Sequence, residues 1–275
     1  MFGEDFVWGV ASSAYQVEGT DAADGRGACV WDMFAADGRV FEHQNADTSC
    51  DHMHHYKEDI ALMRHLGIRA YRFSLNWARI LPEGTGRVNE KAIAMYRDMI
   101  LTMKENGITP YLTLFHWEFP QALYERGGWQ NPDVVQWFGE YAKVVAENFS
   151  DICEYFITIN EPQCVVGLGH LSGVHAPGVK LPVAQTFLVA HHLLMAHGQA
   201  VINLRRYAVR PVRIGFAPTG GVAYPYTDRS EDIEAAKKVY FGFYNPIDNW
   251  TWNVSWFSDP VFLGHYPEEG LKKFA

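Results

Sequence analysis

Short apolar runs rich in β-branched and aromatic residues alternate along this chain with longer segments of helical periodicity. The runs expected to be strands are residues 6–11, 71–75, 110–115, 155–159 and 212–216. The segments expected to be helices follow them, at 56–66, 92–103, 134–149, 183–207 and 231–243. The runs read as continuous apolar segments rather than as polar–apolar alternation, which is typical of parallel strands covered on both faces. Repeated βαβ units of this kind build either a doubly wound open sheet or a closed barrel.

Side chains suited to chemistry follow several of the expected strands. Gln16 follows the first strand, His116 and Trp117 follow the third, and Asn160 and Glu161 follow the fourth. Barrel enzymes collect their active-site residues from the C-terminal ends of several strands in this way. No Gly-x-Gly-x-x-Gly follows the first strand, so the usual dinucleotide fingerprint of a doubly wound sheet is absent. We therefore predict an α/β fold of the (β/α)8 TIM-barrel type.

The composition narrows the classes of partner. A net charge of −9 and the absence of a Lys/Arg run argue against nucleic acid. No apolar run reaches membrane-spanning length, and no basic and apolar leader follows Met1, so we expect a cytoplasmic protein without a membrane partner. Aromatic residues make up 15% of the chain, which leaves rings beyond those that a core needs. Such rings pack against the apolar faces of sugars.

The histidine-rich segment 51–55 is the one candidate for a metal site. His52 and His55 have the spacing of one helix face, and histidine is a zinc ligand. However, Glu58 and Asp59 follow in what reads as the solvated start of a helix. We therefore expect no metal here. His191, His192 and His197 fall on a long helix and are interpreted as packing or surface residues.

Residues 158–162, Thr-Ile-Asn-Glu-Pro, end the fourth expected strand. Glu161 then lies at the mouth of a barrel, directly after an amide side chain. Pro162 cannot continue a strand ladder, so the chain turns outward there. From spacing alone, a catalytic acid and an ordinary solvated or paired glutamate at a strand end remain equally good interpretations.

Several long segments, taken in order, resemble the family 1 glycoside hydrolases, which include β-glucosidases, β-galactosidases and 6-phospho-β-glucosidases. The resemblance runs along essentially the whole chain, which makes it far more specific than any single motif. The segments that carry it are residues 6–19, 71–82, 115–121, 160–162 and 173–178. One departure is Glu118, where the family usually has aspartate; the change is expected to keep the charge.

The resemblance implies a role for each site residue and requires no metal and no cofactor. Glu161 would be the general acid that protonates the departing oxygen and then the base that activates water. Asn160 would bind the sugar 2-hydroxyl, and Arg72 would hold the catalytic nucleophile ionised and oriented. The residues expected to bind other hydroxyls of the first sugar are Gln16, His116 and Trp117. The substrate would be a β-glucoside or β-galactoside.

The second carboxylate of a retaining glycosidase is not found in the expected context. The family carries it in a Thr/Ile-x-Glu-Asn-Gly motif on the seventh strand, and no such motif occurs in residues 1–275. We therefore expect residues 1–275 to be one partial barrel domain that lacks its C-terminal units. Such a chain would be inactive alone, with exposed strand edges that pair with a missing segment or another copy.

Three explanations remain open at this point. The chain is a fragment of a longer enzyme, one subunit of a split glycosidase, or a non-catalytic half-barrel that serves in sugar binding or assembly. The first is favoured, because an intact acid/base motif and sugar-contact residues would serve little purpose in a scaffold.

Overall fold

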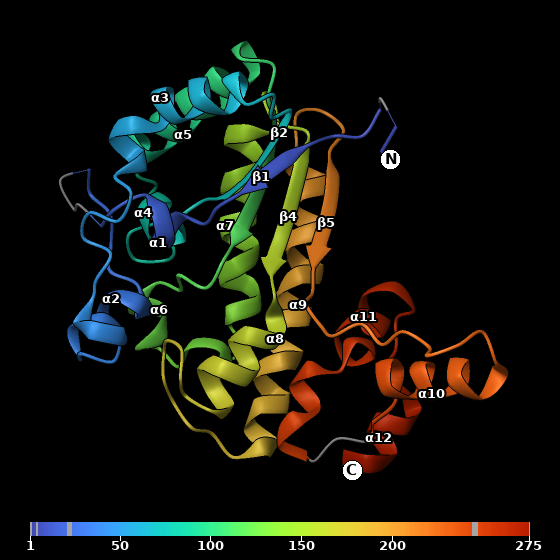
Figure 1. Cartoon of the computed structure of the whole chain (residues 1–275). Coiled ribbons are helices and arrows are strands. Elements are labelled where there is room, and N and C mark those ends of the chain that lie inside the picture. Colours follow the sequence, from blue (N-terminus) through green and yellow to red (C-terminus); the bar gives the residue numbers. More distant parts are fainter. Residues whose placement is uncertain (1, 4, 21–23, 244–246, 275) are drawn as a thin grey trace.

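The computed structural model describes residues 2–3, 5–20, 24–243 and 247–274, which form one parallel sheet with helices packed around it (Figure 1). The strands are β1 (Gly9–Ala11), β2 (Ala70–Ser74), β3 (Thr109–Phe115), β4 (Tyr155–Asn160) and β5 (Arg213–Ala217). The longer helices are α2 (Val30–Ala36), α3 (His52–His65), α5 (Glu90–Glu105), α7 (Val134–Phe149), α9 (Val183–Tyr207), α10 (Ser230–Phe241), α11 (Val254–Phe262) and α12 (Glu268–Phe274). The shorter helical elements are α1 (Ala14–Val17), η1 (Phe41–His43), α4 (Trp77–Ile80), α6 (Gln121–Tyr124), η2 (Gly128–Gln130), α8 (Pro162–Cys164), η3 (Val165–Leu171) and η4 (Ile247–Trp252).

The strand order distinguishes between the two architectures that periodicity left open. Each strand pairs in parallel with the next one along the chain, in the order β1-β2-β3-β4-β5. A doubly wound sheet reverses its direction of growth near the middle, whereas a barrel adds every strand on the same side. The register is also staggered, because Ala11 at the end of β1 lies in the same row as Tyr155 at the start of β4. Such a stagger is what barrel closure requires.

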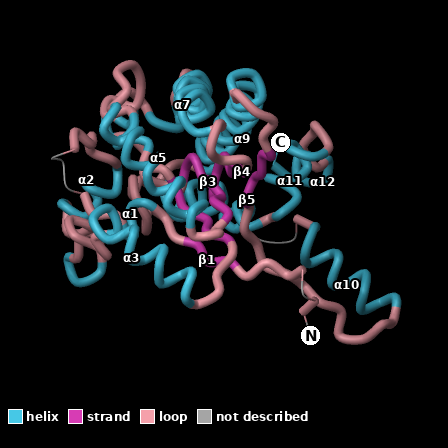
Figure 2. The backbone as a smooth tube through the Cα atoms, turned by 90° about the horizontal axis from the view of Figure 1, so that it is seen from above, coloured by secondary structure: helices cyan, strands magenta, loops and turns pink. Residues whose placement is uncertain are grey.

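The helical periodicities predicted for α5 and α7 are confirmed by the packing. In α5 the residues at helical spacing, Ala92, Tyr96, Met99 and Met103, are all buried. Figure 2 shows α7 and α9 side by side over the outer face of the sheet, and the two helices make extensive contact. The predicted bounds of the long helix, 183–207, match α9. Apolar burial along these faces therefore holds the helices on the strands.

Two expectations about the first units were wrong. The predicted strand over 6–11 is reduced to β1, and all three residues of β1 are exposed. Upstream of β1, the rings of Phe6 and Trp8 pack in an exposed cluster with Phe2, at ring-centroid distances of 4.2–5.2 Å. Continuous apolarity predicted burial on both faces, but β1 is an edge strand in the described structure. An edge strand has a neighbour on one side only, so apolar side chains are insufficient to bury it.

Helix α3 begins at His52, four residues before the predicted start. The His52 side chain is buried, and its ring lies 6.1 Å from the Tyr71 ring of β2. Packing against the sheet thus extends the helix beyond its apolar pattern. None of the described helices is both long and apolar enough to cross a membrane.

Two adjacent residues of α5 test how far core packing stabilises this fold. Ile100 is fully buried, whereas Leu101 is 40% exposed. We expect Ile100→Ala to lower the free energy of unfolding by about 2–5 kcal/mol, since it removes buried methyl groups and leaves a cavity. Leu101→Ala, the matched control, should change it by less than about 1 kcal/mol. Urea unfolding followed by circular dichroism measures both. Equal losses would contradict the assigned helix orientation.

Candidate active site

Asn160, the last residue of β4, joins three neighbouring side chains at the C-terminal edge of the sheet. Its side-chain oxygen accepts a hydrogen bond from Arg72 Nη2 at 2.7 Å, which fixes the orientation of the amide. Its Nδ2 therefore faces His116 Nε2, at 3.2 Å. Its backbone oxygen accepts from Trp117 Nε1 at 3.1 Å. Four residues predicted to form a site are thus in direct contact, although they come from β2, β4 and the segment after β3.

Burial determines the charge of His116, and the contact with Asn160 determines its tautomer. Burial, assisted by the positive charge of Arg72, lowers the pKa of His116 to about 4, so the imidazole is neutral at pH 7. An amide nitrogen can only donate, so Nε2 accepts and the ring proton resides on Nδ1. His116 Nδ1 is buried and has no hydrogen-bond partner among the described residues. The site therefore contains an unused N–H donor, as a polyhydroxylated ligand requires.

Arg72 extends along the sheet from β2. Its Nε donates to Thr113 Oγ1 at 2.9 Å, while Nη2 bonds Asn160. Burial lowers the pKa of Arg72, and the negative charge of Glu161 partly offsets this effect. The guanidinium is therefore fixed by two neutral partners and still interacts with the Glu161 carboxylate. The carboxylate that Arg72 was predicted to orient is not among these partners.

Glu161 turns the chain away from the sheet. Its φ of 44° and ψ of 66° fall in the left-handed region, which costs a non-glycine residue about 1–2 kcal/mol. Its N–H donates to Ala217 O of β5 at 2.7 Å, and this bond holds the strained turn. The side chain is half-buried, and Cys164 Sγ donates to Oε2 at 3.4 Å. Strain of this kind is typical of functional positions.

Gln16 lies on α1, directly after β1, and its side chain lines the same cavity as His116 and Trp117. The cavity has a volume of about 340 Å³, which suits a small-molecule site. Its Oε1 accepts from Ser13 Oγ at 2.7 Å, so the amide group retains its donor hydrogens. The structure therefore brings Gln16 to the predicted site without a direct hydrogen bond to the Asn160 cluster.

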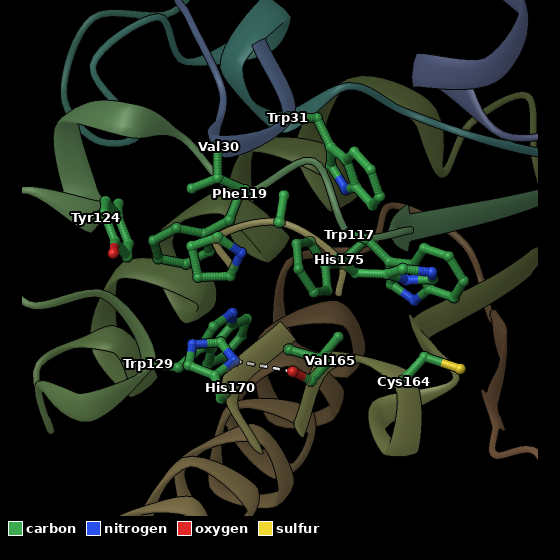
Figure 3. Close-up of a pocket in the computed structure, with 13 residues that line it drawn as sticks. Val30, Trp31, Trp117, Phe119, Tyr124, Trp129, Cys164, Val165, His170 and His175 are labelled. Carbon is green, nitrogen blue, oxygen red and sulfur yellow. Dashed lines mark hydrogen bonds between the residues drawn. The ribbon is translucent and has the colours of Figure 1, made fainter. Parts of the chain in front are cut away.

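An aromatic wall completes this cavity, and two of its members, Trp31 and His175, were not among the predicted site residues. Trp31 of α2, Trp117 and His175 line it, and the His175 ring lies 5.4 Å from Trp31 and 5.5 Å from Trp117. Figure 3 shows His175 and Trp117 close together, with Trp31 above them. The high aromatic content of the sequence indicated that some rings would lie outside the core. Only the fold shows which rings these are.

Glu118 corrects the expectation that the departure from aspartate keeps a charge. The side chain is fully buried, and burial raises its pKa to about 8, so the carboxyl is mostly protonated at pH 7. Ser74 Oγ donates to Oε1 at 3.4 Å, and Oε2 has no partner among the described residues. Ser74 Oγ also accepts from Ala14 N at 2.7 Å, which connects Glu118 to the helix that carries Gln16.

The histidines after Cys50 pair with carboxylates. His52 bonds Asp59, His54 bonds Asp51, and His55 bonds Glu58, at 2.5–2.6 Å. In the part of the chain that the structure describes, no group of three or more His, Cys, Asp or Glu residues has the geometry to hold a metal ion. Of the later histidines, His192 bonds a backbone oxygen and His197 bonds Thr158, as packing residues do.

Comparison with known proteins assigns this chain to a family. The sequence model of glycosyl hydrolase family 1 matches residues 1–275. The chain belongs to glycosyl hydrolase family 1. Similar family 1 proteins include beta-glucosidase A of Acetivibrio thermocellus, 41% identical over 274 residues, and beta-glucosidase A of Thermotoga maritima, 43% identical over 268 residues. These matches cover 99% and 97% of this chain but 58% of each relative, so the chain spans a little over half of their length.

Solved structures of similar proteins show which larger architecture the five-stranded sheet is part of. The family 1 β-glucosidase of Thermotoga maritima superimposes with a TM-score of 0.86 at 42% identity, over 98% of this chain and 59% of that one. The same enzyme in complex with deoxynojirimycin gives a TM-score of 0.87. The five-stranded sheet is thus part of a (β/α)8 barrel, and the predicted fold class is confirmed.

The buried carboxyl of Glu118 predicts a pH dependence of stability. Its pKa is about 8 in the folded chain against 4.5 for an exposed glutamate, so the folded state retains a proton that the unfolded state loses. Stability should therefore fall as the pH rises from about 4.5 to about 8, and this contribution should be constant above that range. Glu118→Gln replaces the carboxyl with a neutral amide. Between pH 5 and pH 8 it should lose less stability than the unmodified chain, by a few kcal/mol.

Urea unfolding at both pH values measures this difference. Glu83→Gln, at an exposed position, is the control and should follow the unmodified chain. If Glu118→Gln also follows it, the buried carboxyl is ionised in the folded state.

Proposed function

We propose that residues 1–275 form one partial barrel domain of a retaining β-glucosidase and supply its general acid/base and most of its first sugar subsite. The main support for this proposal is the Asn160 cluster, in which Arg72, His116 and Trp117 contact Asn160 beside Glu161. Membership of glycosyl hydrolase family 1 and the β-glucosidase names of its relatives support the reaction class and the glucoside substrate.

Glu161 is proposed to act twice. In the first step, a carboxylate nucleophile attacks the anomeric carbon, the bond to the leaving oxygen breaks, and Glu161 gives its proton to that oxygen. In the second step, Glu161 takes a proton from water, the water oxygen attacks the anomeric carbon, and the nucleophile is released as a carboxylate. Cys164 Sγ donates to Glu161 Oε2, and the charge of Arg72 interacts with the same carboxylate, so both contacts help to hold the side chain at the mouth of the sheet.

The sugar is proposed to bind through unused hydrogen-bonding groups. Neutral His116 offers its Nδ1–H, and Gln16 offers its amide hydrogens, while Asn160 would contact the 2-hydroxyl. The aromatic wall would cover the apolar face of the ring. Mostly neutral groups line this pocket, as a neutral hexose needs.

The nucleophile is proposed to come from outside residues 1–275. The Glu-Asn-Gly triplet of this chain, residues 105–107, ends α5 and leads into β3, so it lies at the edge of the sheet opposite Asn160. Further β/α units would close the barrel between the free edges of β5 and β1. A separate polypeptide carrying them is the alternative, and the hydrogen-bonded site favours either enzyme over a scaffold.

Glu161→Gln in the complete enzyme tests the proposal. With a poor leaving group such as the glucose of cellobiose, kcat/KM should fall by about 10²–10⁴, because acid assistance is lost. With an activated dinitrophenyl β-glucoside, the glycosylation step measured by burst kinetics should change only a few-fold. Glu105→Gln, in the triplet on the far edge, is the matched control and should leave both substrates unaffected. Equal losses on the two substrates would refute the acid role.

A further inference from the structure

Arg39, an exposed residue after α2, bridges two loops that meet at the aromatic wall. Its Nη2 donates to the backbone oxygens of Gly173 and Gly178, each at 2.9 Å. Residues 173–178, which we term the His175 loop, lie between η3 and α9 and carry His175 of the wall. One guanidinium therefore contacts both ends of the loop.

The ends of the His175 loop are shaped to receive this guanidinium. Gly173 has a φ of +71° and Gly178 a φ of +77°, backbone conformations that other residues adopt at a cost. A Cβ atom at Gly178 would overlap the guanidinium of Arg39. On its inner side the loop is anchored to η3 by His175 N to Leu168 O, at 3.1 Å. The outer side of the loop is thus tied down by Arg39.

Arg39 also supports the other half of the wall. Its Cζ lies 4.4 Å from the centre of the Phe34 ring, in a cation–π arrangement. Phe34 is buried and packs edge-on against Trp31 at 5.5 Å. Trp31 in turn contacts His175. Arg39 therefore contacts both Phe34, which packs against Trp31, and the loop that carries His175. Through these contacts it influences the distance between the Trp31 and His175 rings.

We propose that Arg39 is a positioning residue that sets the distance between Trp31 and His175 and thereby the affinity of the sugar cavity. The inference rests on the proposed function. Arg39 does not line the cavity and does not contact Glu161 or the Asn160 cluster, so it acts on binding and not on bond cleavage. Loss of the guanidinium leaves two carbonyls to water and frees the wall to open.

Steady-state kinetics of the complete enzyme with an aryl β-glucoside separate binding from chemistry. Arg39→Ala should raise KM about tenfold and leave kcat within about twofold. Arg39→Lys keeps one cation that can reach both carbonyls but loses the planar stacking on Phe34, so KM should rise only about threefold. Arg210→Ala, an exposed arginine before β5 at the opposite edge, is the control and should leave KM unchanged.

Hydrogen exchange supplies a readout that needs no turnover. The amides of His175 and Val179 bond η3, and in Arg39→Ala they should exchange at least about tenfold faster, while those within α9 keep their rates. Unchanged loop exchange overturns the proposal, as does faster exchange with an unchanged KM. If the unmodified enzyme hydrolyses no β-glucoside, the proposed function fails, and the exchange data alone then decide whether Arg39 holds the loop.

Discussion

The Asn160 side chain is the interaction on which the site depends. An amide can accept from a guanidinium through its oxygen and donate to an imidazole through its nitrogen at the same time, without carrying a charge itself. With Arg72 on one side and His116 on the other, its orientation is fixed, and this fixes the tautomer of His116 in turn. The adjoining Glu161 leaves the strand in a left-handed conformation, which its bond to β5 maintains. The geometry of the site is thus set by backbone position and a few neutral hydrogen bonds.

Two buried carboxyl groups near the site, those of Glu18 and Glu118, hold α1 in different ways. Glu18, directly after α1, is buried and accepts from Arg79 and Tyr96, which ties α1 to α4 and α5. Burial raises the pKa of Glu18 despite the favourable charge of Arg79. Such a pair contributes little net stability, yet breaking it is costly. Its effect is to hold α1, and with it Gln16, in one position. Glu118 supports the start of the same helix as a neutral acid through Ser74.

The staggered sheet explains why residues far apart in sequence form one pocket. Parallel strands that are each displaced along their neighbours place their C-terminal ends around one mouth. The loops that leave this edge are long, and they supply Trp31 and His175. Trp31 of the wall lies on α2 and His175 lies on an irregular loop, so the spacing of the two rings depends on side-chain contacts such as those of Arg39. The outer strands β1 and β5 each have one unpaired edge in the described structure, and β1 is exposed as a consequence.

Periodicity alone determined the βα alternation, the buried faces of α5 and α7 and the bounds of α9, because these depend on local spacing of apolar residues. The placement of polar residues at strand ends predicted that Gln16, His116, Asn160 and Glu161 gather at the C-terminal edge of the sheet, where the structure places them. Three features needed the tertiary structure. The exposure of β1 depends on whether a neighbour covers it, the neutral state of Glu118 depends on burial, and the choice of Trp31 and His175 as wall residues depends on how α2 and the His175 loop meet. Each is a property of what surrounds a residue in space, which sequence spacing does not encode.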